Sequence, residues 1–257
     1  MGSVGQVISE IDGLPVYYEA YGEGRPIVFL PGWGNANGEG RDVHEPVFID
    51  RPGWRRIYVD PPGTGNTPAG DWIKDQDGML DVIARVIDDV VGSAPFAIAG
   101  TSAGGLHARG LVRRDPQRIL GLMLRVPGVV VDRAERQLPE YRELGAAFQE
   151  AHREKQEKYY DPAEQQADLE FLGAIQSDLT KYSLSGDLTV RLEAPTLIVT
   201  GRQDTMTGYA DAWSLLEDYP RATYAVLDRA DHDLPIQNHA LYHALMADWL
   251  TRVEEQL

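Results

Sequence analysis

The chain has 257 residues, 43% of them hydrophobic, and its 40 acidic against 24 basic residues give a formal net charge of −16. This length is enough for one domain with a large core. The negative charge makes nucleic acids and anionic membrane surfaces unfavourable partners, and the lack of cysteine excludes disulfides and thiolate catalysis. Met1–Ser9 lacks the basic and apolar regions of a secretory signal, and no apolar run reaches the ~18 residues of a membrane span. We therefore expect a cytoplasmic protein.

The first part of the chain is predicted to form a β-hairpin and two further strands. Gln6–Ile11 and Leu14–Tyr21 are β-prone runs joined by Asp12-Gly13, which is a strong hairpin signal. Apolar residues then predict strands at Pro26–Leu30 and Arg56–Asp60. Each of these two strands ends in a loop rich in glycine and proline.

A helix, a strand and a second helix are predicted next. Asp75–Val91 has apolar residues at helical spacing, Pro95–Ala99 is a short apolar strand, and Ala103–Arg114 reads as a helix. The turn Gly100-Thr101-Ser102-Ala103-Gly104 joins the last two elements. A strand that turns sharply into a helix leaves its central serine exposed at the top of a sheet, and flanking glycines allow the close packing this needs. On the motif alone, a glycine-rich turn with a helix-capping serine is an equal alternative.

The second half predicts a helical insertion followed by renewed strand–helix alternation. Ile119–Val126 is a strand that is apolar apart from Arg125. Asp132–Tyr160 is dense in Glu, Arg, Lys and Gln, and Pro162–Ser185 is mixed, with no strand-like run in either. Residues 128–187 are far more than a parallel-sheet crossover requires. Leu138, Tyr141, Leu144 and Phe148 are predicted to form the inner apolar stripe of this insertion. The later elements are predicted to be a strand at Pro195–Thr200, a helix at Tyr209–Asp218, a strand at Thr223–Leu227 and a helix at Asn238–Glu254.

This alternation predicts an α/β fold whose mostly parallel central sheet has helices on both faces. Residues 1–127 and 188–257 would form the core, and residues 128–187 a helical lid inserted after the sixth strand.

Two later loops offer partners for Ser102. A serine hydroxyl needs an imidazole to take its proton and a carboxylate to orient that imidazole. Such groups should lie in loops at the carboxyl ends of other parallel strands. Asp204 and His232 each follow a predicted strand, and the chain order Ser102, Asp204, His232 is the one expected for a serine in such a turn. Asp132, Asp228 and Asp231 are the alternative carboxylates.

Over nearly its whole length the sequence resembles the α/β-hydrolase superfamily. The matching pieces are the hairpin, Pro31-Gly32-Trp33-Gly34, Asp60–Gly65, the Ser102 turn, Gly201-Arg202-Gln203-Asp204 and the His232 loop. The resemblance implies a catalytic triad of Ser102, Asp204 and His232, without a metal or organic cofactor. It also implies an oxyanion hole formed by the N–H groups of Trp33 and Ala103, and it places Gly32 beside the substrate.

The sequence departs from the family pattern at three places. Pro31 stands where the family usually has histidine, and it has no N–H, so Trp33 must supply that donor. Asp231 and Asp233 flank His232, where many members have glycine and an aromatic residue. Arg125 interrupts an apolar strand, and a buried guanidinium needs a partner. That partner is either an acid of the lid or a substrate carboxylate bound by Arg125.

The predicted function is a serine hydrolase that cleaves a small ester, lactone or thioester through an acyl-enzyme intermediate. Serine at this turn argues against haloalkane dehalogenases and epoxide hydrolases, which resemble this fold but place aspartate there. Two alternatives stay open: a carbon–carbon bond hydrolase of dienone-type acids, and a ligand receptor with slow or no turnover. We expect a small-molecule acyl substrate as the partner, and we leave formation of a homodimer open.

Overall fold

The computed structural model describes residues 3–256. Met1, Gly2 and Leu257, which belong to the predicted core ranges, lie outside the described residues, as does the start of the segment Met1–Ser9. Within the described part of the chain, no helix is both long and apolar enough to cross a membrane.

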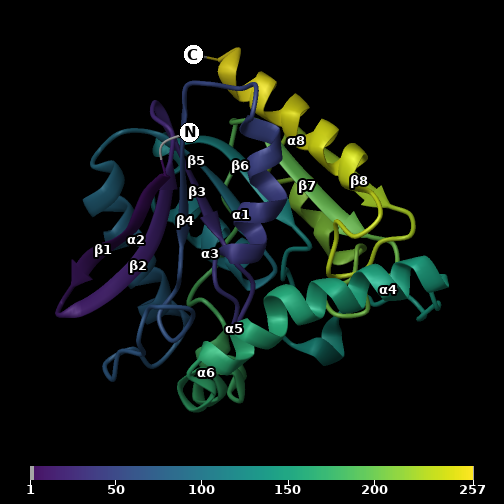
Figure 1. Ribbon diagram of the computed structural model, residues 1–257, viewed down its shortest axis with the longest axis horizontal. Coiled ribbons are helices and arrows are strands. Elements are labelled where there is room, and N and C mark those ends of the chain that lie inside the picture. Colours follow the sequence, from purple (N-terminus) through teal and green to yellow (C-terminus); the bar gives the residue numbers. More distant parts are fainter. Residues whose placement is uncertain (1–2, 257) are drawn as a thin grey trace.

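The fold is built on one eight-stranded sheet with the order β1-β2-β4-β3-β5-β6-β7-β8 (Figure 1). Strand β2 pairs antiparallel with both β1 and β4, and all other neighbours are parallel. The strands are β1 (Ser3–Ile11), β2 (Leu14–Tyr21), β3 (Arg25–Leu30), β4 (Trp54–Val59), β5 (Phe96–Thr101), β6 (Ile119–Arg125), β7 (Thr196–Gly201) and β8 (Ala222–Leu227). The predicted α/β fold with a mostly parallel sheet is therefore confirmed.

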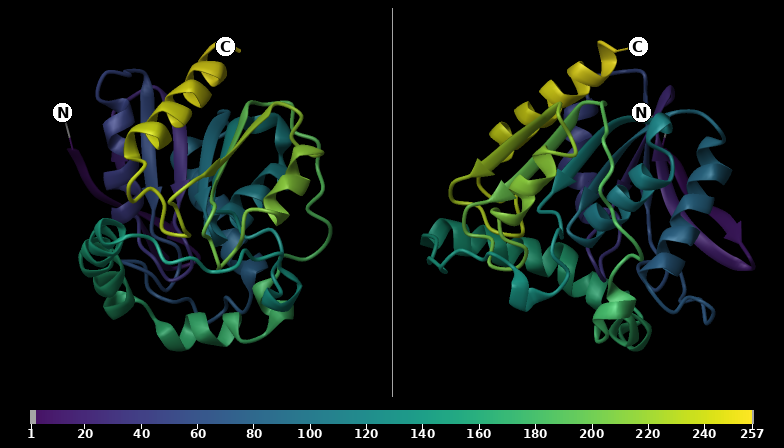
Figure 2. Two further views of the ribbon diagram at one scale, coloured as in Figure 1. Left: turned by 90° about the vertical axis from the view of Figure 1, so that its right-hand side faces the viewer. Right: turned by 180° about the vertical axis from the view of Figure 1, so that it is seen from behind.

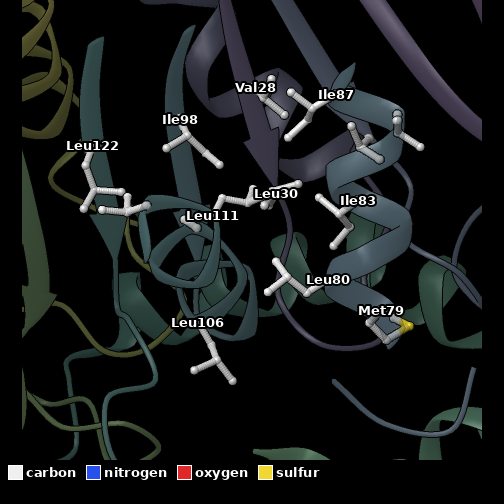
Figure 3. Close-up of a cluster of buried hydrophobic side chains, with 14 of the residues drawn as sticks. Val28, Leu30, Met79, Leu80, Ile83, Ile87, Ile98, Leu106, Leu111 and Leu122 are labelled. Carbon is white, nitrogen blue, oxygen red and sulfur yellow. The ribbon is translucent and has the colours of Figure 1, made fainter. Parts of the chain in front are cut away.

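Helices cover both faces of the sheet (Figure 2). One face packs against α2 (Gln76–Val91) and α3 (Ala103–Arg114), and the other packs against α1 (Gly38–His44) and α8 (His239–Glu254). Figure 3 shows the first of these cores, in which Val28, Leu30 and Ile98 of the sheet meet side chains of both helices. The alternate β3 residues Ile27 and Phe29 belong to the core on the opposite face. Burial on both faces explains why these strands are apolar throughout.

A helical segment joins β6 to β7 and lies below the carboxyl ends of the strands (Figures 1 and 2). It contains α4 (Ala146–Lys155), a π-helical turn (Gln156–Tyr160), α5 (Asp161–Gln166), α6 (Leu169–Gln176) and α7 (Leu179–Tyr182). The predicted inner stripe is wrong in three of its four positions, because α4 begins only at Ala146. Leu138 and Leu144 lie before the helix begins and are half-buried. Tyr141 also lies before the helix, and it is 67% exposed. Phe148 is buried as predicted.

Two other elements differ from the prediction. The helix expected at Tyr209–Asp218 is a shorter 3₁₀ helix at Asp211–Leu216, and helix α1 was not predicted. Two of the seven residues of α1 are glycine, which lowers its local helix propensity. Its start is stabilised from outside, because the carboxylate of Asp60 accepts a hydrogen bond from the Asn37 N–H at 2.9 Å. Further 3₁₀ helices lie at Glu45–Phe48, Pro116–Arg118 and Arg133–Glu135.

Candidate active site

Ser102 occupies a strained turn between β5 and α3. Its φ of 53° and ψ of −116° fall outside the regions that residues other than glycine prefer, as is typical of functional positions. The Ser102 N–H donates to the Arg125 carbonyl at 2.9 Å, and the Ser102 carbonyl accepts from the N–H groups of Gly105 and Gly128. The Ser102 hydroxyl forms no capping hydrogen bond to α3. The alternative of a helix-capping serine is therefore wrong.

The two glycines that flank Ser102 allow a close approach of backbones, as the sequence predicted. A Cβ atom on Gly100 would overlap the carbonyl oxygen of Gly104. A Cβ atom on Gly104 would overlap the carbonyl oxygens of Leu30 and Pro31 at the end of β3. The sharp turn and the packing of α3 on the sheet thus both require glycine here.

Ser102, His232 and Asp204 form a hydrogen-bonded chain. The His232 Nε2 atom lies 3.0 Å from Ser102 Oγ, and the His232 Nδ1 atom lies 3.0 Å from Asp204 Oδ2. In the tautomer with its proton on Nδ1, His232 donates to Asp204 and accepts the Ser102 hydroxyl proton at Nε2. Among the described carboxylates, Asp204 is the one that hydrogen-bonds His232, and the rivals Asp132, Asp228 and Asp231 do not.

Asp204 is fully buried and is held by four donors. Its oxygens accept hydrogen bonds from the N–H of Met206 at 2.8 Å, from the N–H of Thr207 at 3.0 Å and from the Thr207 hydroxyl at 2.8 Å, in addition to the bond from His232. Burial by itself would raise the pKa of Asp204. The hydrogen bond and the charge of His232, together with two hydrogen bonds from Thr207, lower this pKa below its usual value. Asp204 is therefore a carboxylate that keeps its negative charge inside the protein.

Two backbone donors beside Ser102 have no partner. The N–H groups of Trp33 and Ala103 make no hydrogen bond to any other residue of the described range 3–256. Both residues lie in the wall of the cavity that contains Ser102. Ala103 is the first residue of α3, where N–H groups are free to bind negative charge. Trp33 lies in a turn in which the Asn35 N–H donates to the Gly32 carbonyl at 3.1 Å.

Ser102 and His232 open into a cavity of about 570 Å³. Its floor comes from the loops at the carboxyl ends of the strands, and Gly32 is part of that floor. Its other walls come from the segment between β6 and β7 and include Val130, Val131, Arg136, Gln156, Tyr160, Leu172 and Tyr182. The ring of Tyr182 meets the ring of Trp33 edge to face, with centroids 5.0 Å apart.

Arg125 forms a buried ion pair, but its partner is not the one predicted. Its two terminal nitrogens lie 2.9 and 2.5 Å from the carboxylate oxygens of Glu39, and its Nε donates to Thr101 at 3.0 Å. Glu39 belongs to α1, whereas the sequence suggested an acid of the lid. The helical segment instead contributes a base, because Lys155 Nζ lies 2.8 Å from Glu39. Burial would raise the pKa of Glu39, but the charges of Arg125 and Lys155 hold it well below its usual range.

The carboxylates that flank His232 are engaged by α4. Asp233 Oδ2 lies 2.7 Å from His152 Nε2, and the Asp233 carbonyl accepts a hydrogen bond from Lys155. Asp231 lies 3.9 Å from the same histidine nitrogen. His152, Asp231 and Asp233 are side chains of types that bind metals, and their ligand atoms lie within 4.8 Å of one another. Their ion pairing accounts for this grouping without an ion.

Sequence reasoning missed four residues of this region: Glu39, Arg136, Lys155 and Thr207. Thr207 had a usable signal, because a threonine three residues after a turn aspartate can return a hydrogen bond to it. The other three had none, since Glu39 lies in the unpredicted helix and Arg136 and Lys155 lie within a run of charged residues.

The fold and this site define an α/β protein with a serine–histidine–aspartate hydrogen-bonded chain at the carboxyl ends of its strands. Residues 27–246 match the sequence model of the Alpha/beta hydrolase family, and the chain belongs to that family.

Relatives of known activity match part of the chain. The pimeloyl-[acyl-carrier protein] methyl ester esterase of Legionella pneumophila (strain Corby) is 32% identical over 105 residues, which span 40% of this chain and only 38% of that esterase. A non-heme chloroperoxidase of Kitasatospora aureofaciens is 30% identical over 123 residues, which span 47% of this chain and 44% of that protein.

Solved structures match the fold over nearly its whole length. An alpha/beta superfamily hydrolase from Oenococcus oeni PSU-1 has a TM-score of 0.84 at 22% identity, covering 99% of this chain and 100% of that one. Est816, described as an N-acyl homoserine lactone degrading enzyme, has a TM-score of 0.73 at 20% identity, covering 94% of this chain and 99% of that one. At these identities the likeness shows the fold alone.

Proposed function

We propose that the protein is a serine hydrolase that cleaves a small ester, lactone or thioester. The observation that carries this proposal is the chain of two 3.0 Å contacts from Ser102 through His232 to the buried Asp204. A serine on a strained turn, a histidine that can accept its proton and a carboxylate that stays ionised are the parts that nucleophilic acyl transfer requires.

In the proposed mechanism, Ser102 Oγ attacks the acyl carbon while His232 Nε2 takes its proton. Asp204 holds the imidazole in the required tautomer and stabilises the imidazolium that forms. The free N–H groups of Trp33 and Ala103 donate to the oxygen that becomes negative in the tetrahedral intermediate. His232 then gives its proton to the leaving group, which produces the acyl-enzyme. A water molecule, deprotonated by His232, attacks the acyl group and releases the acid and free Ser102.

The size and origin of the cavity support a small substrate. Its volume of about 570 Å³ is in the usual range for small-molecule sites. We propose that the helical segment 128–187 acts as a lid, because its side chains line the cavity that contains Ser102. Partial sequence resemblance to a methyl ester esterase supports an ester among the bonds proposed. A cytoplasmic location stays a prediction from the sequence, and the formation of a homodimer stays open.

In the carbon–carbon bond hydrolase alternative, Arg125 was a candidate to bind the substrate acid. All three nitrogens of Arg125 already hydrogen-bond Glu39 or Thr101, so Arg125 gives that alternative no support. The receptor alternative differs from the hydrolase in turnover, and the next experiment separates the two.

The test is a burst assay with p-nitrophenyl acetate, run with wild type, Ser102→Ala and the control Ser93→Ala. Ser93 is an exposed serine in the turn before β5, away from the cavity. We expect a stoichiometric burst, steady turnover and labelling by a fluorophosphonate for wild type and Ser93→Ala, and none of these for Ser102→Ala. A wild-type protein without burst or labelling, or labelling that persists in Ser102→Ala, would overturn the proposal.

A further inference from the structure

Arg136 lies in the wall of the cavity that contains Ser102 and His232. Its guanidinium is held by backbone oxygens alone. Nε donates to the Val130 carbonyl at 2.8 Å, and the two terminal nitrogens donate to the carbonyls of Val131 at 2.8 Å and Met206 at 2.6 Å. These three contacts fix the position of the side chain between the segment that follows β6 and the loop that follows β7.

None of these contacts neutralises the charge of Arg136. No carboxylate among residues 3–256 lies within ion-pair distance of its guanidinium, although the chain as a whole is strongly acidic. Arg125, the other arginine of the cavity wall, is paired with Glu39. A guanidinium has five N–H donors, and three of those of Arg136 are used, which leaves two for a ligand.

The other charges of the cavity wall are either paired or at the surface. Glu39 binds Arg125 and Lys155, and Asp233 binds His152. Glu164 is an exposed residue of α5. Arg136 is thus the half-buried charge of this wall that lacks a counter-ion within the described structure. Burial lowers its pKa, but an arginine stays protonated at neutral pH.

Arg136 lines the same cavity as the reacting groups Ser102 and His232. The ring of Tyr182 touches that of Trp33, and the charge of Arg136 opposes the effect of burial that raises the pKa of Tyr182 to about 12. Tyr182, Trp33 and Ala103 line the same cavity as Arg136. A substrate carbonyl bound at Trp33 and Ala103 therefore shares this cavity with the Arg136 guanidinium.

We propose that Arg136 binds a carboxylate of the substrate, so that the preferred substrate is an ester, lactone or thioester that carries a carboxylate a few atoms from the scissile carbonyl. This inference rests on the proposed hydrolase function and names the substrate class of the same site. An arginine pairs with a carboxylate through two parallel hydrogen bonds, which suits the two free donors. Because the net charge of −16 repels anions at long range, this local cation decides whether an anionic substrate binds.

The test compares two matched pairs of substrates. In the first pair, p-nitrophenyl hydrogen adipate carries a carboxylate on the acyl side and p-nitrophenyl hexanoate does not. In the second, 4-acetoxybenzoate carries it on the leaving group, and methyl 4-acetoxybenzoate is neutral. kcat/KM is measured for wild type, Arg136→Gln, Arg136→Lys and the control Arg133→Gln. Arg133 is exposed and has the same charge, but it is not part of the cavity wall.

We expect Arg136→Gln to lower kcat/KM for the anionic member of at least one pair by about 10-fold to 100-fold, as for loss of a charge-assisted hydrogen bond. The neutral member should change by less than about 3-fold, which excludes general loss of folding. Arg136→Lys should recover part of the loss, and Arg133→Gln should leave the ratio within each pair unchanged. Equal losses on both members of both pairs, or no loss on either anionic member, would overturn the proposal.

Binding of adipate and hexanoate to Ser102→Ala, measured by calorimetry with and without Arg136→Gln, separates this proposal from the hydrolase proposal. If wild type turns over no ester but adipate binds in an Arg136-dependent manner, the hydrolase proposal fails and the role of Arg136 stands. If the neutral esters are turned over and neither binding nor selectivity depends on Arg136, the hydrolase proposal stands and this inference fails.

Discussion

Lys155 Nζ lies 2.8 Å from Glu39 Oε1, so helix α4 is joined by a buried ion pair to helix α1. The same nitrogen donates to the carbonyl of Asp233, the residue after His232. One side chain of the helical segment therefore contacts both the carboxylate that neutralises Arg125 and the loop that presents His232.

Removal of the Glu39 charge should strongly destabilise the protein. Glu39→Gln leaves Arg125 and Lys155 without their shared counter-ion, and breaking a buried pair in this way costs about 3–5 kcal/mol. Urea unfolding measures the free energy of unfolding. The control is Asp248→Asn, which breaks an exposed pair with Arg252 and should cost less than about 1 kcal/mol. Equal effects of the two substitutions would contradict the importance of the buried pair.

The contact between His152 and Asp233 should be sensitive to pH. The hydrogen bond that His152 donates to Asp233 raises the pKa of His152. Burial alone would raise the pKa of Asp233, but its contacts with His152 and Lys155 lower it. The stability that His152 contributes to the folded protein is therefore fully present below its unfolded pKa of about 6.5, and it is lost as the pH rises through its higher folded pKa. The stability that Asp233 contributes is fully present above its unfolded pKa, and it is lost as the pH falls through its lower folded pKa.

His152→Gln measures this effect. We expect it to lower the free energy of unfolding by at most about 1 kcal/mol near pH 6, because both side chains are partly exposed, and to have almost no effect near pH 9. Urea unfolding of both proteins at the two pH values is the measurement. A difference between the proteins that does not change with pH would show that the pair does not titrate as described.

Gly104→Ala should disrupt the turn that presents Ser102. The added Cβ atom would overlap two backbone oxygens at the end of β3, which cannot move independently of the sheet. We expect a loss of about 1–3 kcal/mol in stability, together with a loss of esterase activity larger than the unfolded fraction explains. Gly173→Ala is the control, since its Cβ meets nothing within 4 Å inside helix α6, and it should stabilise by up to about 1 kcal/mol. An active Gly104→Ala protein would refute the need for close packing.

Thr207 should position Asp204 and His232. Thr207→Val removes the hydroxyl that donates to Asp204 at 2.8 Å, and we expect kcat to fall by about 10-fold while KM changes little. Asp204→Asn should lower kcat by about 10⁴-fold through the wrong histidine tautomer. Thr200→Val is the matched control, because Thr200 is equally buried but its hydroxyl contacts Tyr224 and the Ala225 carbonyl. A kcat for Thr207→Val equal to that of the control would dismiss the positioning role.

The sequence by itself determined the strands of the sheet and the chain order of the candidate triad. Apolar runs bounded by turn residues predict β3, β5 and β7 because a strand buried on both faces has a local signature. The Ser102 turn could be predicted because the two glycines that its close packing requires, Gly100 and Gly104, lie within one five-residue stretch of the sequence. Asp204 and His232 could be located because parallel strands bring the loops that follow them to one edge of the sheet.

Only the tertiary structure decided how the charged residues pair. Arg125 and Glu39 are 86 positions apart, and the start of α1, which carries Glu39, is stabilised by a hydrogen bond from the Asn37 N–H to the remote Asp60 carboxylate. The run that contains Arg136 and Lys155 is dense in charged residues, so no local pattern distinguishes the base that pairs with Glu39 from the arginine that lacks a counter-ion within residues 3–256. Ion pairing depends on distances of a few ångströms between side chains that are remote in sequence, and those distances exist only in the folded chain.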